Sequence, residues 1–184
     1  MPDYSQPLSP EKYLVSKCRD LPFYECLINT DWEEQGMASI LISRKMPSGK
    51  IIVGFYIVDT YCLGLKNSLF KFAVTETEYQ EFLAEISGRS MVMMECGLTQ
   101  AHNIIYGAID YAEELGFQPE KSFKITEFIL DFSLIDDGID RIKFGRDDKP
   151  FFVAGPYDNV SQIIAKLEKS VGAGNFDFVL PPEY

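Results

Sequence analysis

Residues 37–62 read MASILISRKMPSGKIIVGFYIVDTYC and set the architecture of the chain. Two runs of apolar and β-branched residues flank Pro47-Ser48-Gly49, a pattern typical of a tight β-hairpin. Residues 51–58 are apolar at odd and even positions alike, apart from Gly54. Because side chains alternate between the faces of a sheet, this predicts a central strand covered on both sides.

The hairpin extends outward on each side into a longer meander. Residues 24–29 and 67–74 are short apolar and aromatic runs, so we predict four successive antiparallel strands over residues 23–74. Upstream, Ser9-Pro10-Glu11 has a serine cap, a proline at the first helical position and an acid in the first turn. A short helix is therefore expected up to about Arg19.

Two helices are predicted over residues 75–117. Thr75 and Glu78 match the capping box, and Gly88 marks the end of that helix. The next helix is expected from Thr99 to Leu115, because its apolar residues recur at intervals of three and four.

The last segment, residues 118–184, is predicted to return to strands at 125–132, 141–144 and 150–154, with residues 145–149 closing a hairpin. Asp158 is expected to cap a final helix that ends at Gly172, followed by a closing strand over 175–180. The whole chain, residues 1–184 with an N-terminal helical segment at 1–22, thus predicts one α+β domain. Its mainly antiparallel sheet packs against three to four helices.

Composition limits the classes of partner. The chain has 17 Lys and Arg against 28 Asp and Glu, a net charge of −11, which disfavours nucleic acid and anionic membranes. No apolar run is long enough to span a bilayer and no leader is evident, so a cytoplasmic location is expected. The basic stretches Ser43-Arg44-Lys45 and Asp140-Arg141-Ile142-Lys143 are interpreted as solvated strand residues.

The four cysteines, Cys18, Cys26, Cys62 and Cys96, form no CxxC pair. They are predicted to be small buried hydrophobic side chains. None directly precedes a predicted helix, which would lower the pKa of its thiol.

Several segments resemble a widespread bacterial domain of unknown function. They are Cys26-Leu27-Ile28-Asn29 with Asp31-Trp32, residues 58–66 (VDTYCLGLK), residues 102–108 (HNIIYGA) continuing to 111–117 (YAEELGF), residues 144–150 (FGRDDKP), Gly155-Pro156-Tyr157-Asp158, and Val171-Gly172 with Gly174-Asn175-Phe176. The resemblance covers most of the chain after residue 23. It implies a self-contained domain of bacterial type and transfers no catalytic residue.

His102 is the only histidine, which excludes sites that need several imidazoles. His102, Tyr106 and Asp110 recur at intervals of four on the second predicted helix, so they share one flank. This flank is either a proton relay or an ordinary polar helix face with a partly buried histidine. A nucleophilic triad of Cys62 or Cys96 with His102 and an acid is a further alternative.

Asp59 interrupts an apolar strand, and a buried carboxylate needs a hydrogen-bonding partner or a ligand. With Asp31 and Asp110 it could form a magnesium-dependent nuclease site. The predicted catalytic residues are therefore Asp59, His102 and Asp110, and the predicted metal ligands are Asp31 and Asp59. No cofactor is expected, because Gly172-Ala173-Gly174 follows a helix instead of opening one.

Trp32, Tyr61 and Tyr157 lie near predicted turns and are the candidate interaction residues, because aromatic side chains anchor interfaces. The preferred hypothesis is a protein-binding or adaptor module with an unidentified protein partner. The alternative is a hydrolase or metal-dependent nuclease built on Asp31, Asp59, His102 and Asp110. Clustering of these four side chains in one cleft would favour the enzyme, whereas their dispersal would favour the binding module.

Overall fold

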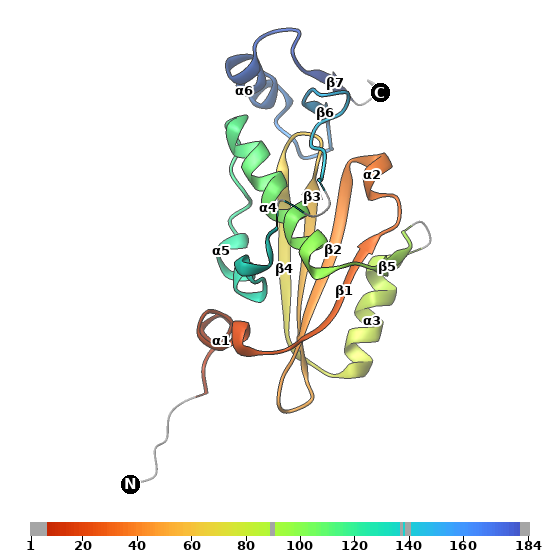
Figure 1. The fold of residues 1–184 in the computed structure, drawn as a ribbon, viewed down its shortest axis with the longest axis vertical. Coiled ribbons are helices and arrows are strands. Elements are labelled where there is room, and N and C mark those ends of the chain that lie inside the picture. Colours follow the sequence, from red (N-terminus) through yellow and green to blue (C-terminus); the bar gives the residue numbers. More distant parts are fainter. Residues whose placement is uncertain (1–6, 89–90, 137, 139–140, 181–184) are drawn as a thin grey trace.

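The computed structural model describes residues 7–88, 91–136, 138 and 141–180, and it confirms the α+β class. Five antiparallel strands form the main sheet in the order β4-β3-β2-β1-β5 (Figure 1). The strands are β1 (Phe23–Asn29), β2 (Met37–Lys45), β3 (Ile51–Asp59), β4 (Gly64–Val74) and β5 (Met93–Glu95). The first four are the predicted meander. β5 and the short helix α2 (Trp32–Gln35) were not predicted.

The central hairpin runs in continuous register from Met37↔Asp59 at one end of β2 to Lys45↔Ile51 at the other. The backbone N–H of Met46 donates to the carbonyl of Lys50 at 2.8 Å and closes the turn. Both faces of β3 are buried, as predicted. Its odd-numbered residues pack with Tyr79 and Phe82, and its even-numbered residues pack with the other face of the core.

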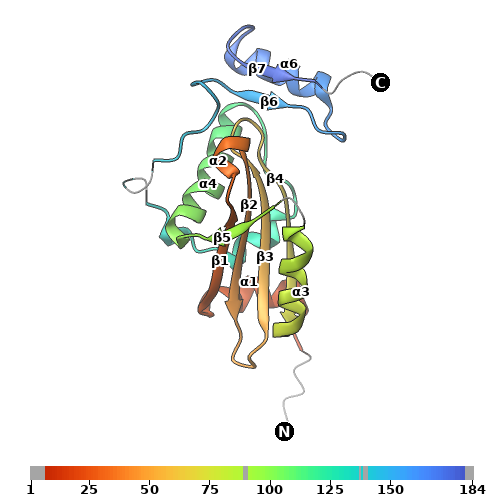
Figure 2. The ribbon, with the colours of Figure 1, turned by 90° about the vertical axis from the view of Figure 1, so that its right-hand side faces the viewer.

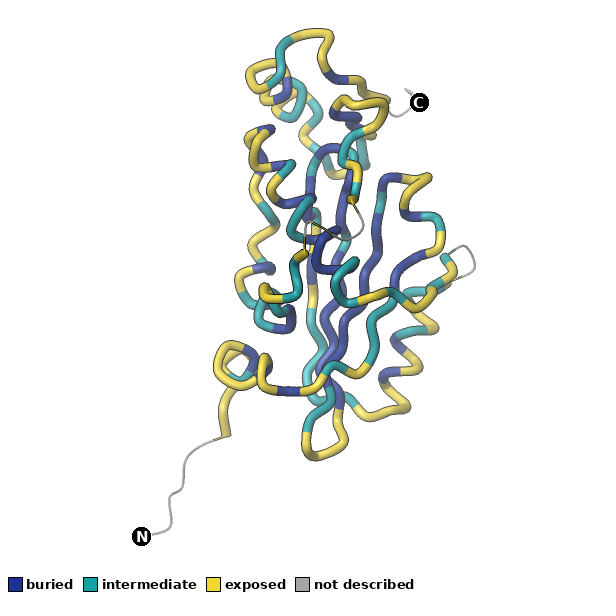
Figure 3. The backbone as a smooth tube through the Cα atoms, viewed as in Figure 1, coloured by how far each residue is buried: buried dark blue, intermediate teal, exposed yellow. Residues whose placement is uncertain are grey.

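Two helices cover opposite faces of the sheet (Figure 2). α3 (Glu76–Ser87) begins with the predicted capping box of Thr75 and Glu78. α4 (Leu98–Glu114) begins one residue earlier than expected and buries its apolar stripe against β3 and β4. The buried residues follow the strands and the inward helix faces, whereas the outer faces are exposed (Figure 3).

Shorter elements complete the face that α4 covers. They are α1 (Pro10–Lys17), η1 (Cys18–Asp20), α5 (Phe123–Thr126), η2 (Glu127–Ile129) and η3 (Phe132–Leu134). The cap of α1 is the predicted Ser9. The strand predicted at 125–132 is wrong, because these residues form helical turns. In this geometry the carbonyls of Glu127, Ile129 and Leu130 accept hydrogen bonds from Arg19 and Arg44.

The C-terminal segment forms a second, two-stranded sheet of β6 (Phe151–Val153) and β7 (Asp177–Val179), which are parallel and joined through α6 (Val160–Val171). It packs on the end of α4 through a separate apolar cluster: Cys62, Ala112, Leu115, Phe117, Phe152, Leu167 and Phe176. The predicted closing strand is thus confirmed, but it pairs outside the main sheet.

Two further predictions in this segment are corrected. Residues 141–144 form no strand, and only the bridge Arg146↔Lys149 remains of the expected hairpin. Asp147 and Asp148 both have positive φ, 52° and 61°, the conformation of a two-residue turn of type I′. Asn159, not Asp158, caps α6, because Asp158 instead accepts from the N–H of Gly155 and pairs with Lys66.

Within the described ranges, no helix combines the length and the apolar character needed to cross a membrane.

Candidate functional site

A pocket of about 390 Å³ lies at the end of the main sheet where β3 turns into β4. Three segments line it: the start of α2, the β3–β4 turn and the segment before β6. The lining residues are Trp32, Glu33, Thr60, Tyr61, Arg141, Ile142, Lys143, Gly145, Arg146 and Asp147. Two of the three predicted interaction residues, Trp32 and Tyr61, therefore meet in one place.

Tyr61 is held firmly over the α2 turn. Its hydroxyl donates to the carbonyls of Glu33 and Glu34, each at 3.0 Å. Gly36 ends α2 with φ of 68°, and a Cβ there would lie only 2.1 Å from the Tyr61 ring. A side chain at Gly36 would thus displace the ring as well as strain the backbone. The ring also packs edge-on against Phe151, with 5.9 Å between centroids.

Asp59, the predicted catalytic acid and metal ligand, organises this turn. It is 6% exposed, and its Oδ1 accepts from the backbone N–H groups of Tyr61 at 2.9 Å and Cys62 at 3.0 Å. Burial raises the pKa of Asp59 above its ordinary value, and the hydrogen bonds from Tyr61, Cys62 and Leu63 oppose that rise. The carboxylate accepts bonds from the turn that carries Tyr61.

Asp31, the other predicted metal ligand, supports the opposite wall. One carboxylate oxygen accepts from Asn29 Nδ2 at 2.8 Å, and the other accepts from Gln35 Nε2. These bonds hold the start of α2, where Trp32 sits. Among the described residues, no group of three or more His, Cys, Asp or Glu side chains could hold a metal ion. The predicted magnesium site thus has no support in the structure.

His102 is completely buried, and both ring nitrogens are bound to backbone. Nδ1 donates to the carbonyl of Leu98 at 2.6 Å, and Nε2 accepts from the N–H of Asp131 at 2.9 Å. These partners fix a neutral imidazole, and burial lowers the pKa of His102. Tyr106 stacks beside it, whereas Asp110 is exposed, so the three residues build no relay into a cleft.

The predicted catalytic residues also lie at different ends of the sheet. The His102 ring contacts Phe23, which pairs with Arg44 on β2, whereas Asp59 pairs with Met37 at the other end of β2. Arg44 and Met37 are seven steps apart along the extended strand, roughly 23 Å at about 3.3 Å per residue. The structure therefore separates His102 from Asp59, whereas Asp31 and Asp59 both lie at the pocket end of the sheet, so the four residues of the enzyme hypothesis do not share one cleft.

Three cations surround the pocket in a chain whose net charge is −11. The guanidinium of Arg146 lies 3.6 Å above the Phe151 ring and 3.8 Å from the exposed carboxylate of Asp147. Arg141 and Lys143 are exposed, and neither has a salt-bridge partner in the part of the chain that the structure describes. Sequence analysis interpreted these two as strand residues. Only the fold shows that they converge on Trp32 and Tyr61.

Tyr157, the third predicted interaction residue, lies elsewhere. It is 98% exposed in the loop between β6 and α6 and does not line the pocket. Four partly exposed apolar residues lie on or beside β6 and β7: Val153, Phe178, Val179 and Leu180. They add apolar surface to the C-terminal segment.

Comparisons with known proteins give no match: no family, no curated protein and no solved structure is significantly similar to this chain. The resemblance to a bacterial domain of unknown function therefore remains a prediction.

Proposed function

We propose that this protein is a binding module that captures a short acidic peptide segment of a partner protein in the pocket formed by Trp32, Tyr61, Arg141, Lys143 and Arg146. The observation that carries the proposal is the convergence of three cations on two aromatic side chains in a chain with an excess of acids. Carboxylates would pair with the cations, and an apolar or planar side chain would pack on the aromatic wall.

The environment of the pocket selects for a short ligand. Among the described residues that line the pocket, three cations face two carboxylates, Glu33 and Asp147, and Arg146 is already near Asp147. The rest of the surface is acidic on average, so it repels a long polyanion such as nucleic acid. A segment with two or three carboxylates fits the local charge without meeting that repulsion.

In the same arrangement, three of the four side chains of the enzyme alternative already have hydrogen-bond partners within the protein. Asp59 and Asp31 are bound to the turns that form the pocket walls, and His102 has no ring nitrogen left for a substrate. Hydrogen bonds hold the pocket walls in place, and a binding pocket needs such preorganised walls.

Trp32 is the only tryptophan of the chain, so its fluorescence reports on this pocket directly. The test is a fluorescence titration of the purified protein with a tryptophan-free peptide rich in Asp and Glu, beside a Lys- and Arg-rich peptide of the same length. We expect a saturable change with the acidic peptide only. The double substitution Arg141→Ala with Lys143→Ala should weaken binding at least about tenfold, because each lost contact involves a charged partner.

The matched control removes two exposed lysines outside the pocket, by Lys124→Ala with Lys169→Ala. It changes the net charge equally and should leave the titration unchanged. Equal weakening in both double variants would show that only net charge matters. Equal binding of both peptides would contradict the proposal.

A further inference from the structure

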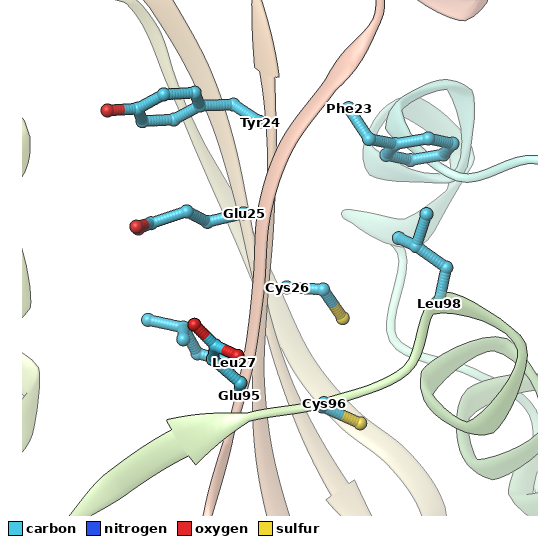
Figure 4. Close-up of a pocket in the computed structure, with 8 residues that line it drawn as sticks. All are labelled: Phe23, Tyr24, Glu25, Cys26, Leu27, Glu95, Cys96 and Leu98. Atoms are coloured by element: carbon cyan, nitrogen blue, oxygen red, sulfur yellow. The ribbon is translucent and has the colours of Figure 1, made fainter.

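Two cysteines lie opposite each other on neighbouring strands at the β1–β5 edge. The antiparallel register Leu27↔Glu95 continues by one position to Cys26 and Cys96, and the N–H of Cys96 donates to the carbonyl of Cys26 at 2.9 Å. Figure 4 shows both sulfur atoms on the same side of β1, in a pocket of about 320 Å³.

The backbone spacing suits a disulfide without rearrangement. Directly opposed residues of antiparallel strands have Cα atoms about 4.5–5.5 Å apart, and disulfides span about 4.4–6.8 Å. The two thiols already interact: the hydrogen bond with Cys96, together with burial, raises the pKa of Cys26 well above its ordinary value. Neither sulfur belongs to a disulfide in the structure, and both residues are partly exposed.

The other two cysteines do not share this environment. Cys18 and Cys62 are completely buried, and burial raises the pKa of each thiol, that of Cys18 to about 11. Around the opposed pair, Phe23 and Leu98 supply an apolar wall, whereas Glu25 extends to the opposite side of β1 (Figure 4). The pair is therefore both accessible and set apart from the remaining thiols.

The two members of the pair differ in their surroundings. Cys96 directly precedes Gly97, the N-cap of α4, so it lies at the positive end of a 17-residue helix. No cysteine was expected at such a position from the sequence, and the earlier start of α4 corrects this. Cys96 is therefore assigned as the attacking thiol, because it lies at the helix end and the pKa of the Cys26 thiol is raised.

We infer that Cys26 and Cys96 are a reversible oxidation site that forms an intramolecular disulfide by exchange with a low-molecular-weight disulfide of the glutathione type. The Cys96 thiolate attacks one sulfur of the small disulfide, which forms a mixed disulfide on Cys96 and releases one thiolate. The Cys26 sulfur then attacks the Cys96 sulfur and releases the second thiolate. Two protein thiols are oxidised, one small disulfide is reduced to two thiols, and these take up the two protons.

The disulfide would join β1 to β5 and so close a covalent loop that contains β2, β3, β4 and α3. Because β5 pairs with β1 over only a few residues, the bond would fix an edge strand that is otherwise weakly held. The site is independent of the proposed peptide pocket, since the two share no lining residue.

The test treats the folded, reduced protein with oxidised glutathione and measures its intact mass. We expect the loss of two hydrogens per chain with no retained glutathione, and peptide mapping without reduction should identify Cys26 joined to Cys96. Dithiothreitol should restore the starting mass.

Serine substitutions separate the two roles. Cys26→Ser should retain one glutathione on Cys96, because the resolving thiol is missing, and Cys96→Ser should form no internal disulfide. A stable glutathione adduct on the unmodified sequence, unchanged thiols, or a link to Cys18 or Cys62 would overturn the assignment. The mapping uses the natural sequence, so the result does not depend on whether a variant folds.

Discussion

Each end of the main sheet buries one charged or titratable side chain, but the two side chains have different roles. At one end Arg44 is 2% exposed and its guanidinium donates to the carbonyls of Ile129 at 2.7 Å, Leu21 at 2.5 Å and Arg19 at 3.2 Å. At the other end Asp59 accepts from the amides of its own turn. In both cases the hydrogen-bond partners of the buried side chain are backbone groups.

What differs is the space around the two groups. The Arg44 end is closed, since the Phe23 ring lies 3.7 Å from the guanidinium and His102 fills the adjacent core. The Asp59 end opens into the pocket with Arg141 and Lys143, two exposed cations that have no salt-bridge partner among the described residues. The same kind of backbone solvation thus supports a sealed core at one end and a binding surface at the other, and substitutions at the two ends should separate stability from binding.

Arg44→Ala should have the largest effect. It removes the donor for three carbonyls and leaves a cavity, so the free energy of unfolding should fall by about 3 kcal/mol or more. Urea denaturation measures the change. Lys45→Ala is the matched control, because Lys45 is the next residue on β2 and makes a partly exposed salt bridge with Glu76, so it should cost less than about 1 kcal/mol. Equal costs would contradict the closed-end interpretation.

His102→Gln should cost about 1–3 kcal/mol at neutral pH, since two backbone partners lose an ideal donor and acceptor. Its pH dependence identifies the neutral imidazole. Because burial lowers the pKa of His102 in the folded state, the unfolded state binds the proton more tightly as pH falls below the ordinary 6.5. The natural protein therefore loses stability in that range, and the difference from the variant should narrow. A constant difference would show that His102 does not titrate there; Asp131 and Arg44 are the charged groups that act on it.

Asp59→Asn should change the free energy of unfolding less than His102→Gln does. Its effect should depend on pH in the opposite direction. The amide oxygen can still accept from Tyr61 and Cys62, so stability at neutral pH should stay within about 1 kcal/mol. Since the pKa of Asp59 is raised in the folded state, its stabilising contribution is full below the ordinary 3.8 and is lost as pH rises through the folded value. The variant, neutral throughout, should gain on the natural protein as pH rises. A loss of several kcal/mol would mean that the ionised form is required.

The smallest effect on stability is expected from Arg141→Ala with Lys143→Ala. Both side chains are exposed and without a salt-bridge partner among the described residues, so the free energy of unfolding should change by less than about 0.5 kcal/mol. Thermal unfolding checks this, and it ensures that a loss of peptide binding is not a loss of fold. A large drop in Tm would show that the two cations stabilise the pocket segment itself.

Local signals in the sequence were sufficient for much of the fold. The capping box of Thr75 and Glu78 and the continuous apolar run around Gly54 depend on neighbours within a few residues, and both predictions are confirmed. The segment 125–132 was predicted wrongly, because its helical turns are stabilised by arginines more than a hundred residues away or across the sheet.

The site was predictable only in part for the same reason. That Asp59 is buried follows from its apolar strand, but the amides that bind it belong to a turn whose geometry the sequence does not show. Arg44 was interpreted as solvated, and this is wrong, since it is buried and its acceptors come from two distant segments, residues 19–21 and Ile129. The nearness of Arg141 and Lys143 to Trp32 arises from the packing of the 141–147 segment, which carries no periodic signal.

The contact of Arg44 with Ile129 has a consequence for the order of events during synthesis. The Ile129 carbonyl lies 85 residues downstream of the arginine, so the four-stranded meander leaves the ribosome long before this acceptor is synthesised, whereas the carbonyls of Arg19 and Leu21 are already present. Until residues 123–134 emerge, that face of the sheet is also uncovered. The meander therefore cannot bury this face while the later residues are still being synthesised. During that time it exposes apolar surface that chaperones bind.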